Sequence, residues 1–238
     1  MRRLIPILQY IINNLDYVVK VSNVVDNGDG TYTLSTCDSF YITEGTRITI
    51  GANVWKVKSF TIDTEFTIEP VSGTPTLGTT TQVTLDTLGF HSGTLKDATG
   101  ERGSAKRARQ TVVPFVWNRE PMQLNRNRDE ESPLYGTLDL EMYILNTCNP
   151  QDWLNNDHHR LSVEPMMNVA DRIYRFVDDR GDLFNDYESE RIVPRVYLGT
   201  QGENRSYDER LFEENLSGIQ SNFELQILNR ALLTCCGN

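Results

Sequence analysis

The sequence predicts an α+β fold in which two helices pack on a small mixed or antiparallel sheet, with an inserted all-β domain. Three observations support it: an apolar helical segment at the N-terminus, a series of short β-type runs after it, and a long amphipathic helix followed by two more β-type runs. We therefore expect an α+β core in residues 1–16 and 111–238, a β-domain in residues 17–90, and a flexible basic loop or arm in residues 91–110.

The first element is an apolar helix in the first 15 residues. Its inward side is expected to hold Leu4, Leu8, Ile11, Ile12 and Leu15, which recur at helical spacing. Polar residues interrupt the segment and no small-residue cleavage site follows, so a helix is favoured over a signal peptide. No apolar run approaches the ~20 residues that span a bilayer, and we expect no membrane partner.

The second region, residues 17–88, alternates short β-type runs with turns. Its strongest signal is Asp-Asn-Gly-Asp-Gly at residues 26–30, because these residues readily adopt the positive φ of a hairpin turn. Further strands are expected at residues 40–42, 47–50, 54–57, 66–68 and 83–85. Closely spaced strands of this kind are typical of a small sandwich or barrel.

The third element is an amphipathic helix over residues 162–178. Its apolar stripe consists of Val163, Met166, Ala170, Ile173 and Val177, widened by Met167 and Tyr174. Ser162 is the expected N-cap and Gly181 the expected stop. Residues 192–198 and 219–228 would supply the sheet that covers the stripe.

Two strands are expected before this helix, at residues 111–117 and 135–145, joined by a long loop at residues 122–133. The second strand alternates regularly, with apolar side chains on one face and Asp139, Glu141 and Tyr143 on the other. That second face must therefore be wet or lie in an interface.

The chain is acidic, with 33 acidic against 23 basic residues and a formal net charge of −10. Such a chain repels nucleic acid on average. Residues 92–110 are the exception, because they are glycine-rich and locally basic. They form either a solvated flexible loop or an arm that orders against an acidic neighbouring subunit. The candidate subunit-interface residues are Arg102, Lys106, Arg107, Arg109, Arg126 and Arg128.

No motif assigns a catalytic, cofactor-binding or metal-binding residue, and we expect a protein without enzyme activity or cofactor. Asp157-His158-His159 matches a tripeptide of metal phosphoesterases, but the chain has only one other histidine, His91. A metal-dependent hydrolase that uses these three residues stays open as an alternative. The glycine-rich turn at residues 26–30 lacks the ligand spacing of a calcium loop.

Three blocks of the chain resemble the tail-terminator, tail-completion and neck-ring proteins of tailed bacteriophages. They are the extended residues 114–117 with the strand at 136–145, the methionine-containing helix at 162–177, and the closing residues 215–227. In that family a short helix precedes a sheet, a second helix packs on it, and the chain ends in a strand.

The resemblance implies a structural virion protein, assembled in the host cytoplasm. It would be a head–tail connector or tail-terminator subunit that forms a homo-oligomeric ring, six-fold or else twelve-fold. Its implied partners are copies of itself and adjoining portal, neck or tail-tube proteins. DNA would pass through the lumen without specific binding.

A different class of function is a binding module. The β-domain would then hold a carbohydrate or a protein, anchored to a larger assembly by the rest of the chain. Five aromatic residues would supply its stacking surface, or else belong to the core: Tyr32, Phe40, Tyr41, Trp55 and Phe60.

Overall fold

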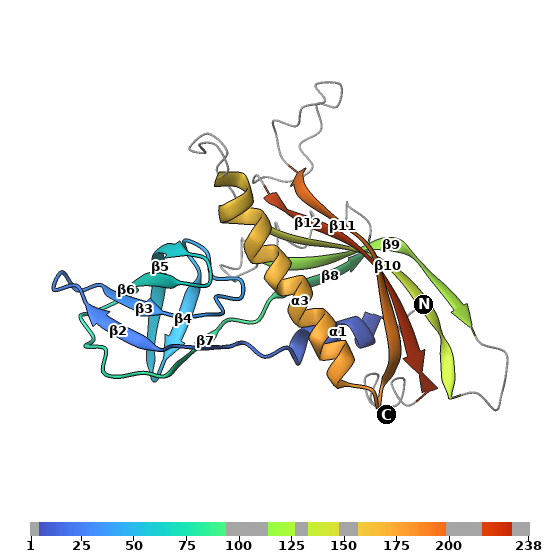
Figure 1. Ribbon diagram of the computed structural model, residues 1–238, viewed down its shortest axis with the longest axis horizontal. Helices are drawn as coiled ribbons and strands as arrows, with labels where there is room; N and C mark the ends of the chain where they lie inside the picture. The colour runs from blue at the N-terminus through green and yellow to red at the C-terminus, as the bar shows by residue number, and fades with distance from the viewer. Residues whose placement is uncertain (1–4, 94–113, 127–132, 148–156, 199–215, 230–238) are drawn as a thin grey trace, which may run out of the picture.

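The computed structural model describes residues 5–93, 114–126, 133–147, 157–198 and 216–229 (Figure 1). The described strands are β1 (Val18–Lys20), β2 (Asn23–Asp26), β3 (Tyr32–Ser35), β4 (Arg47–Ile50), β5 (Asn53–Thr61), β6 (Glu65–Pro70), β7 (Gln82–Leu85), β8 (Gly89–Gly93), β9 (Phe115–Arg126), β10 (Leu134–Thr147), β11 (Phe184–Leu198) and β12 (Leu216–Leu228). The described helices are α1 (Ile5–Asn13) and α3 (Glu164–Asp179), the latter preceded by the π-helical turn η2 (His159–Val163).

The predicted fold class, two helices on a small sheet, is wrong. The protein is mostly β, with one sheet of seven strands, one of five, a single long helix and the short α1 among the described residues. The sequence indicated strand for residues 192–198, but β11 begins at Phe184, and β9 continues to Arg126 through residues expected to form a loop. These extensions are largely polar. Backbone hydrogen bonds alone can hold a strand in a sheet where one of its faces is not covered, so no apolar alternation marks these residues in the sequence.

The seven-stranded sheet has the order β1-β7-β4-β5-β6-β3-β2 and curls into a barrel. Its two edge strands, β1 and β2, follow one another in the chain with only two residues between them. The N–H of Val21 donates to the carbonyl of Thr81 beside β7, and the N–H of Ser22 donates to the carbonyl of Ser35 in β3, both at 2.9 Å. Both edges of the sheet therefore meet at this point. Closure of this kind protects strand edges from pairing with other chains.

The expected hairpin at residues 26–30 is confirmed, and it connects β2 to β3. Gly28 and Gly30 adopt φ of +77° and +84°, which glycine tolerates without strain. The expected strand at residues 40–42 is wrong, because this segment is a turn in which Phe40 has a φ of +48°. The turn is nevertheless buried, with Phe40 and Ile42 fully inaccessible.

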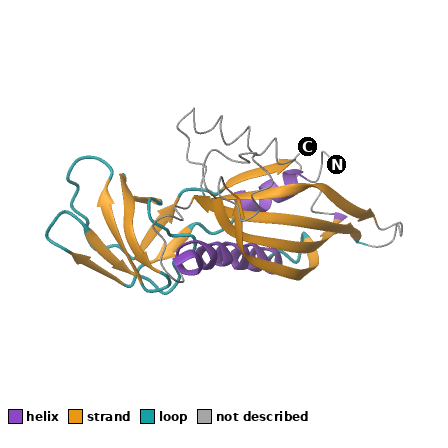
Figure 2. Ribbon diagram, turned by 90° about the horizontal axis from the view of Figure 1, so that it is seen from above, coloured by secondary structure: helices purple, strands orange, loops and turns teal. Residues whose placement is uncertain are grey.

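The five-stranded sheet has the order β11-β12-β10-β9-β8. Its neighbours pair antiparallel except β8, which runs parallel to the first residues of β9 and was not expected from the sequence. The helix α3 lies across one face of this sheet (Figures 1 and 2). Tyr174 of α3 contacts Phe223 of β12 with ring centroids 5.2 Å apart, and its hydroxyl lies 2.6 Å from that of Ser221.

The start of α3 differs from the prediction. Ser162 is not an N-cap, because η2 runs directly into α3 and places Ser162 inside the helical segment, where its hydroxyl is buried without a partner among the described residues. Met167, which was expected to widen the apolar stripe, is exposed. Val169, which was not assigned to the stripe, is buried instead. The end is as predicted, since the helix stops at Asp179, two residues before Gly181.

Barrel and five-stranded sheet share one hydrophobic core, which also includes α1 and α3. Polar contacts cross the junction as well. The side-chain amide of Asn146 in β10 donates to Thr43 Oγ1 at 2.8 Å, and that of Asn168 in α3 donates to the carbonyl of Phe40 at 3.3 Å. Burial of these contacts holds the barrel in a fixed position on the sheet.

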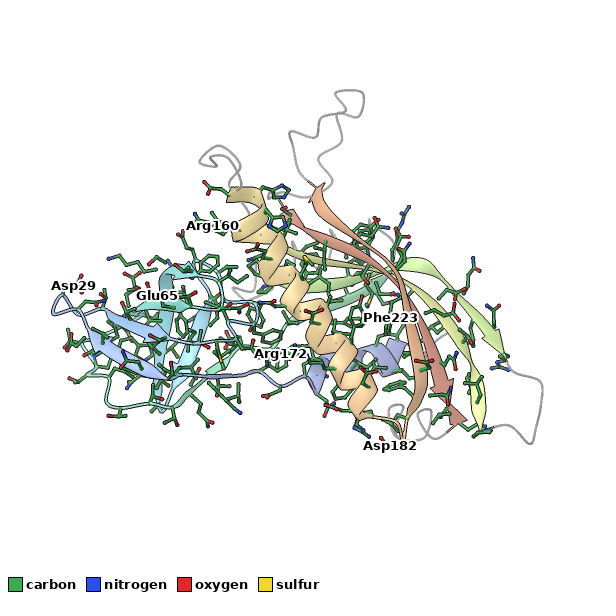
Figure 3. All side chains as sticks on the ribbon, viewed as in Figure 1. Asp29, Glu65, Arg160, Arg172, Asp182 and Phe223 are labelled. Atoms are coloured by element: carbon green, nitrogen blue, oxygen red, sulfur yellow. The ribbon has the colours of Figure 1, made fainter. Side chains whose placement is uncertain are left out.

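Arg172 of α3 contributes most of these junction contacts, and Figure 3 shows it on the side of the helix toward the barrel. Its guanidinium lies 2.8 Å from Asp38 and donates to the carbonyls of Asp16 and Val18. It also stacks over the ring of Phe40, 4.1 Å from the centroid. The side chain is only 12% exposed, so these partners replace its hydration.

Candidate functional site

The face of the five-stranded sheet opposite α3, which we call the outer face, carries the most distinctive polar surface among the described residues. Strand alternation separates the two faces along β10. Leu138, Met142 and Ile144 are buried on the helix side, whereas Asp139 and Glu141 point outward and are half-buried. The sequence predicted this alternation and that the second face is wet or lies in an interface.

A hollow of about 540 Å³ opens on this side of the sheet. It is lined by residues of β9, β10 and β12: Gln123, Asn125, Asp139, Leu140, Glu141, Gln220, Asn222, Phe223 and Glu224. Among these described residues three are acidic, four carry side-chain amides, and none is basic. The lining can therefore accept hydrogen bonds from cations and exchange hydrogen bonds with amide groups.

Glu141 is the centre of a hydrogen-bonded network beside the hollow. Its Oε1 accepts hydrogen bonds from the hydroxyl of Tyr143 at 2.6 Å and from the side-chain amide of Gln220 at 2.9 Å. Arg119 of β9 approaches the same oxygen at 3.2 Å, and the two residues are directly opposite one another in the strand register. One carboxylate thus fixes side chains from three neighbouring strands.

The electrostatics follow from these contacts. The carboxylate of Glu141 raises the pKa of Arg119 above its usual value. Burial, reinforced by the hydrogen bond to Glu141, raises the pKa of Tyr143 to about 12. The Tyr143 ring stacks on Trp117, with centroids 4.9 Å apart. The phenol is therefore a neutral donor that orients Glu141, rather than a group that exchanges protons near neutral pH.

Next to this network, acidic residues stand in register across three strands. Asp139 of β10 pairs with Glu224 of β12, and Glu224 pairs in turn with Glu188 of β11. Like charges directly opposite one another destabilise a sheet. We call these three register positions the acidic row. Nothing in the amino-acid sequence alone aligns them, since β10 and β12 are about 80 residues apart.

A second, smaller hollow of about 170 Å³ lies at the junction of the barrel and α3. It is lined by Cys37, Asp38, Asp63, Asn168, Asp171, Arg172 and Arg175. Four of these residues are engaged in the structure itself. Arg172 pairs with Asp38, Asn168 donates to the carbonyl of Phe40, and Asp63 accepts hydrogen bonds from the N–H and hydroxyl of Ser39 at 2.8 and 2.9 Å. Cys37 carries a free, exposed thiol. We therefore assign this hollow to the contact between the barrel and α3 and not to a ligand site.

Of the six predicted interface residues, the structure describes one. Arg126 lies at the end of β9, exposed, with its guanidinium 5.2 Å from the centroid of the Tyr135 ring. It stands on a strand and not in the expected loop. The others lie outside the described residues: Arg102, Lys106, Arg107, Arg109 and Arg128.

The tripeptide Asp157-His158-His159 begins the helical segment, and its side chains have separate partners. Asp157 pairs with Arg160 at 3.2 Å, His158 contacts the hydroxyl of Ser217, and His159 lies 3.0 Å from Glu164. In the described part of the chain, no group of three or more His, Cys, Asp or Glu side chains is arranged to hold a metal ion. The three side chains of the tripeptide therefore do not converge on one point in the described structure.

The five aromatic residues of the barrel do not form a stacking surface. Tyr32, Phe40, Tyr41 and Trp55 are buried in the core, and Phe60 is partly buried against it. Their interpretation as core residues is confirmed.

Comparisons with protein-family models, curated proteins and solved structures gave no match for this chain. None of the helices in the described residues combines the length and apolar character needed to cross a bilayer. The assignment of function therefore depends on the geometry given above.

Proposed function

We propose that this protein is a non-enzymatic structural subunit that assembles with copies of itself into a ring. By the resemblance described above, the ring would be a head–tail connector or tail terminator in the virion of a tailed bacteriophage. Adjoining neck or tail-tube proteins would be its further partners. DNA would pass through its lumen without specific binding.

The observation that carries this proposal is the rigid junction between barrel and sheet. A subunit of a ring must present its contact surfaces at fixed angles, because small angular errors prevent closure. Here a continuous core, the Asn146–Thr43 hydrogen bond and the Arg172 contacts fix the barrel relative to the outer face of the sheet.

The test is the assembly state of the purified full chain, measured by sedimentation velocity and negative-stain imaging, alone and with its neck or tail-tube neighbours. We expect closed rings of one size. A chain that stays monomeric with those neighbours present, or a full-length chain that binds glycans through residues 17–90, would contradict the proposal and favour the binding-module alternative.

A further inference from the structure

The hairpin between β2 and β3 carries the only Asn-Gly dipeptide of the sequence, Asn27 and Gly28. In such a dipeptide the backbone nitrogen of the glycine can attack the side-chain carbonyl carbon of the asparagine, because glycine has no Cβ to obstruct the approach. Both residues are exposed, and a Cβ built at Gly28 would meet nothing within 4 Å. The Asn27 amide is therefore open to water and has the least hindered following residue.

A carboxylate lies beside the nitrogen that would attack. The N–H of Gly28 donates to Asp26 Oδ1 at 2.8 Å. The nitrogen must lose this proton when it forms a bond to carbon, and a carboxylate within hydrogen-bond distance can accept it as a general base. Asp26 is itself exposed, so it can exchange the proton with solvent.

The amide that would be attacked is held by two threonines. Asn27 Nδ2 donates to Thr31 Oγ1 at 2.9 Å and to Thr33 Oγ1 at 3.2 Å. The hydroxyl of Thr33 also donates to Asn27 Oδ1 at 3.4 Å. These contacts fix the amide relative to β3, and they place a hydroxyl at the oxygen on which negative charge develops during the attack.

We propose that Asn27 is a site of spontaneous deamidation and that Asp26 promotes the reaction. The Gly28 nitrogen forms a bond to Asn27 Cγ, and its proton passes to Asp26. The Cγ–Nδ2 bond then breaks, and the amide nitrogen takes up that proton and leaves as ammonia. Water opens the resulting succinimide at either of its two carbonyl groups, which leaves aspartate or isoaspartate at position 27. This inference is independent of the proposed function.

The modification would weaken the closing edge of the barrel. A carboxylate at position 27 cannot donate to Thr31 or Thr33, and it adds negative charge between Asp26 and Asp29. Isoaspartate also lengthens the backbone by a methylene group, at a residue whose N–H donates to the carbonyl of Thr31 at 3.1 Å. Because β2 is one of the two strands at which the barrel closes, older molecules should have a less stable barrel.

The test incubates the folded full chain near neutral pH and follows each asparagine by peptide mapping with mass spectrometry, with enzymatic methylation to detect isoaspartate. Asn27 should convert at about ten times the rate of Asn23 or Asn53, which are exposed but precede valine, a β-branched residue that hinders the attack. The converted protein should also melt at a lower temperature than fresh protein. Equal rates at the three asparagines would overturn the proposal.

The decisive variant is Asp26→Ser, because serine still offers an acceptor to the Gly28 N–H but cannot take its proton. It should slow the conversion of Asn27 by about tenfold. The matched control, Glu44→Gln, removes an exposed carboxylate outside the hairpin and should leave the rate unchanged. The same rate in the wild type and in Asp26→Ser would refute the role of Asp26.

A comparison without variants separates the geometry from the dipeptide itself. The wild-type chain unfolded in urea keeps Asn27 and Gly28 but loses the fixed contacts to Asp26, Thr31 and Thr33, so it should convert Asn27 more slowly than the folded chain. Equal or faster conversion in urea would show that the hairpin protects Asn27 instead, and the proposal would fail.

Discussion

At the residue scale, Arg172 is the side chain with the most consequential contacts. It joins α3 to the barrel through an ion pair, two backbone carbonyls and the face of Phe40. Because the side chain is almost buried, truncating it leaves carbonyls and a carboxylate without their donor.

We expect Arg172→Ala to lower the free energy of unfolding by about 2–3 kcal/mol. Arg175→Ala is the matched control, because Arg175 lies almost one turn further along α3 and is exposed. It should change stability by less than about 0.5 kcal/mol. Urea titration of both variants measures the difference, and equal costs would show that the Arg172 contacts are not specific.

Tyr17 gives a pH dependence. Its hydroxyl donates to the carbonyl of Ile12 at 2.7 Å and accepts from the N–H of Leu88 at 3.2 Å, and burial raises its pKa to about 12. The neutral phenol is thus favoured in the folded state. Its stabilising contribution is complete below the unfolded pKa of about 10 and is lost as the pH rises through about 12.

The free energy of unfolding of the wild type should therefore decrease above a pH of about 10. Tyr17→Phe should make this decrease with pH less steep, by the equivalent of up to one proton. Stability measured by denaturant titration across this range tests the prediction. Tyr41 and Tyr143, whose pKa values burial also raises, leave a residual dependence of stability on pH in the variant. An unchanged slope would mean that Tyr17 ionises with equal ease in the folded and unfolded chain.

At the element scale, the central pair β10–β12 approaches unusually closely at a glycine. A Cβ added at Gly218 would lie 2.0 Å from the carbonyl oxygen of Ile144, a distance no real contact shows. Gly136 has a similar constraint, since its Cβ would lie 2.5 Å from the carbonyl oxygen of Asn125. Glycine at these positions permits the close strand contact.

Gly218→Ala should force β12 away from β10 and cost about 2–4 kcal/mol of stability. Gly78→Ala is the control, because a Cβ there meets nothing within 4 Å and its φ is not positive. Thermal unfolding of the two variants checks this. A neutral Gly218→Ala would show that the strands can separate at that point without loss.

The sequence predicted the individual elements of this region unevenly. Alternation of apolar residues located β10, and apolar residues at helical spacing located the buried side of α3, because both periodicities are visible in the order of the residues. It did not reveal β8, whose pairing depends on β9, or the polar ends of β9 and β11. It also placed Ser162 at a cap, since no local signal shows that η2 continues the helix backward.

At the scale of the whole molecule, the shared core makes the barrel and the sheet one cooperative unit. Trp55 reports on the barrel and Trp117 on the sheet, and both are buried. In proteins that retain only one of them, with Trp153→Phe in both, fluorescence unfolding transitions should coincide. Adding Arg172→Ala should shift both midpoints together. Two separate midpoints would show that the barrel unfolds independently of the sheet.

What the sequence alone determined is local: the hairpin at residues 26–30, the amphipathic face of α3, the alternation of β10 and the basic character of residues 92–110. These depend on neighbouring residues and on charge counts. Only the tertiary structure decided that the fold is mostly β, that β1 and β2 close a barrel, and that Asp139 and Glu224 meet across two strands. These features arise from strand pairing between distant residues, and pairing partners have no signature in a single chain.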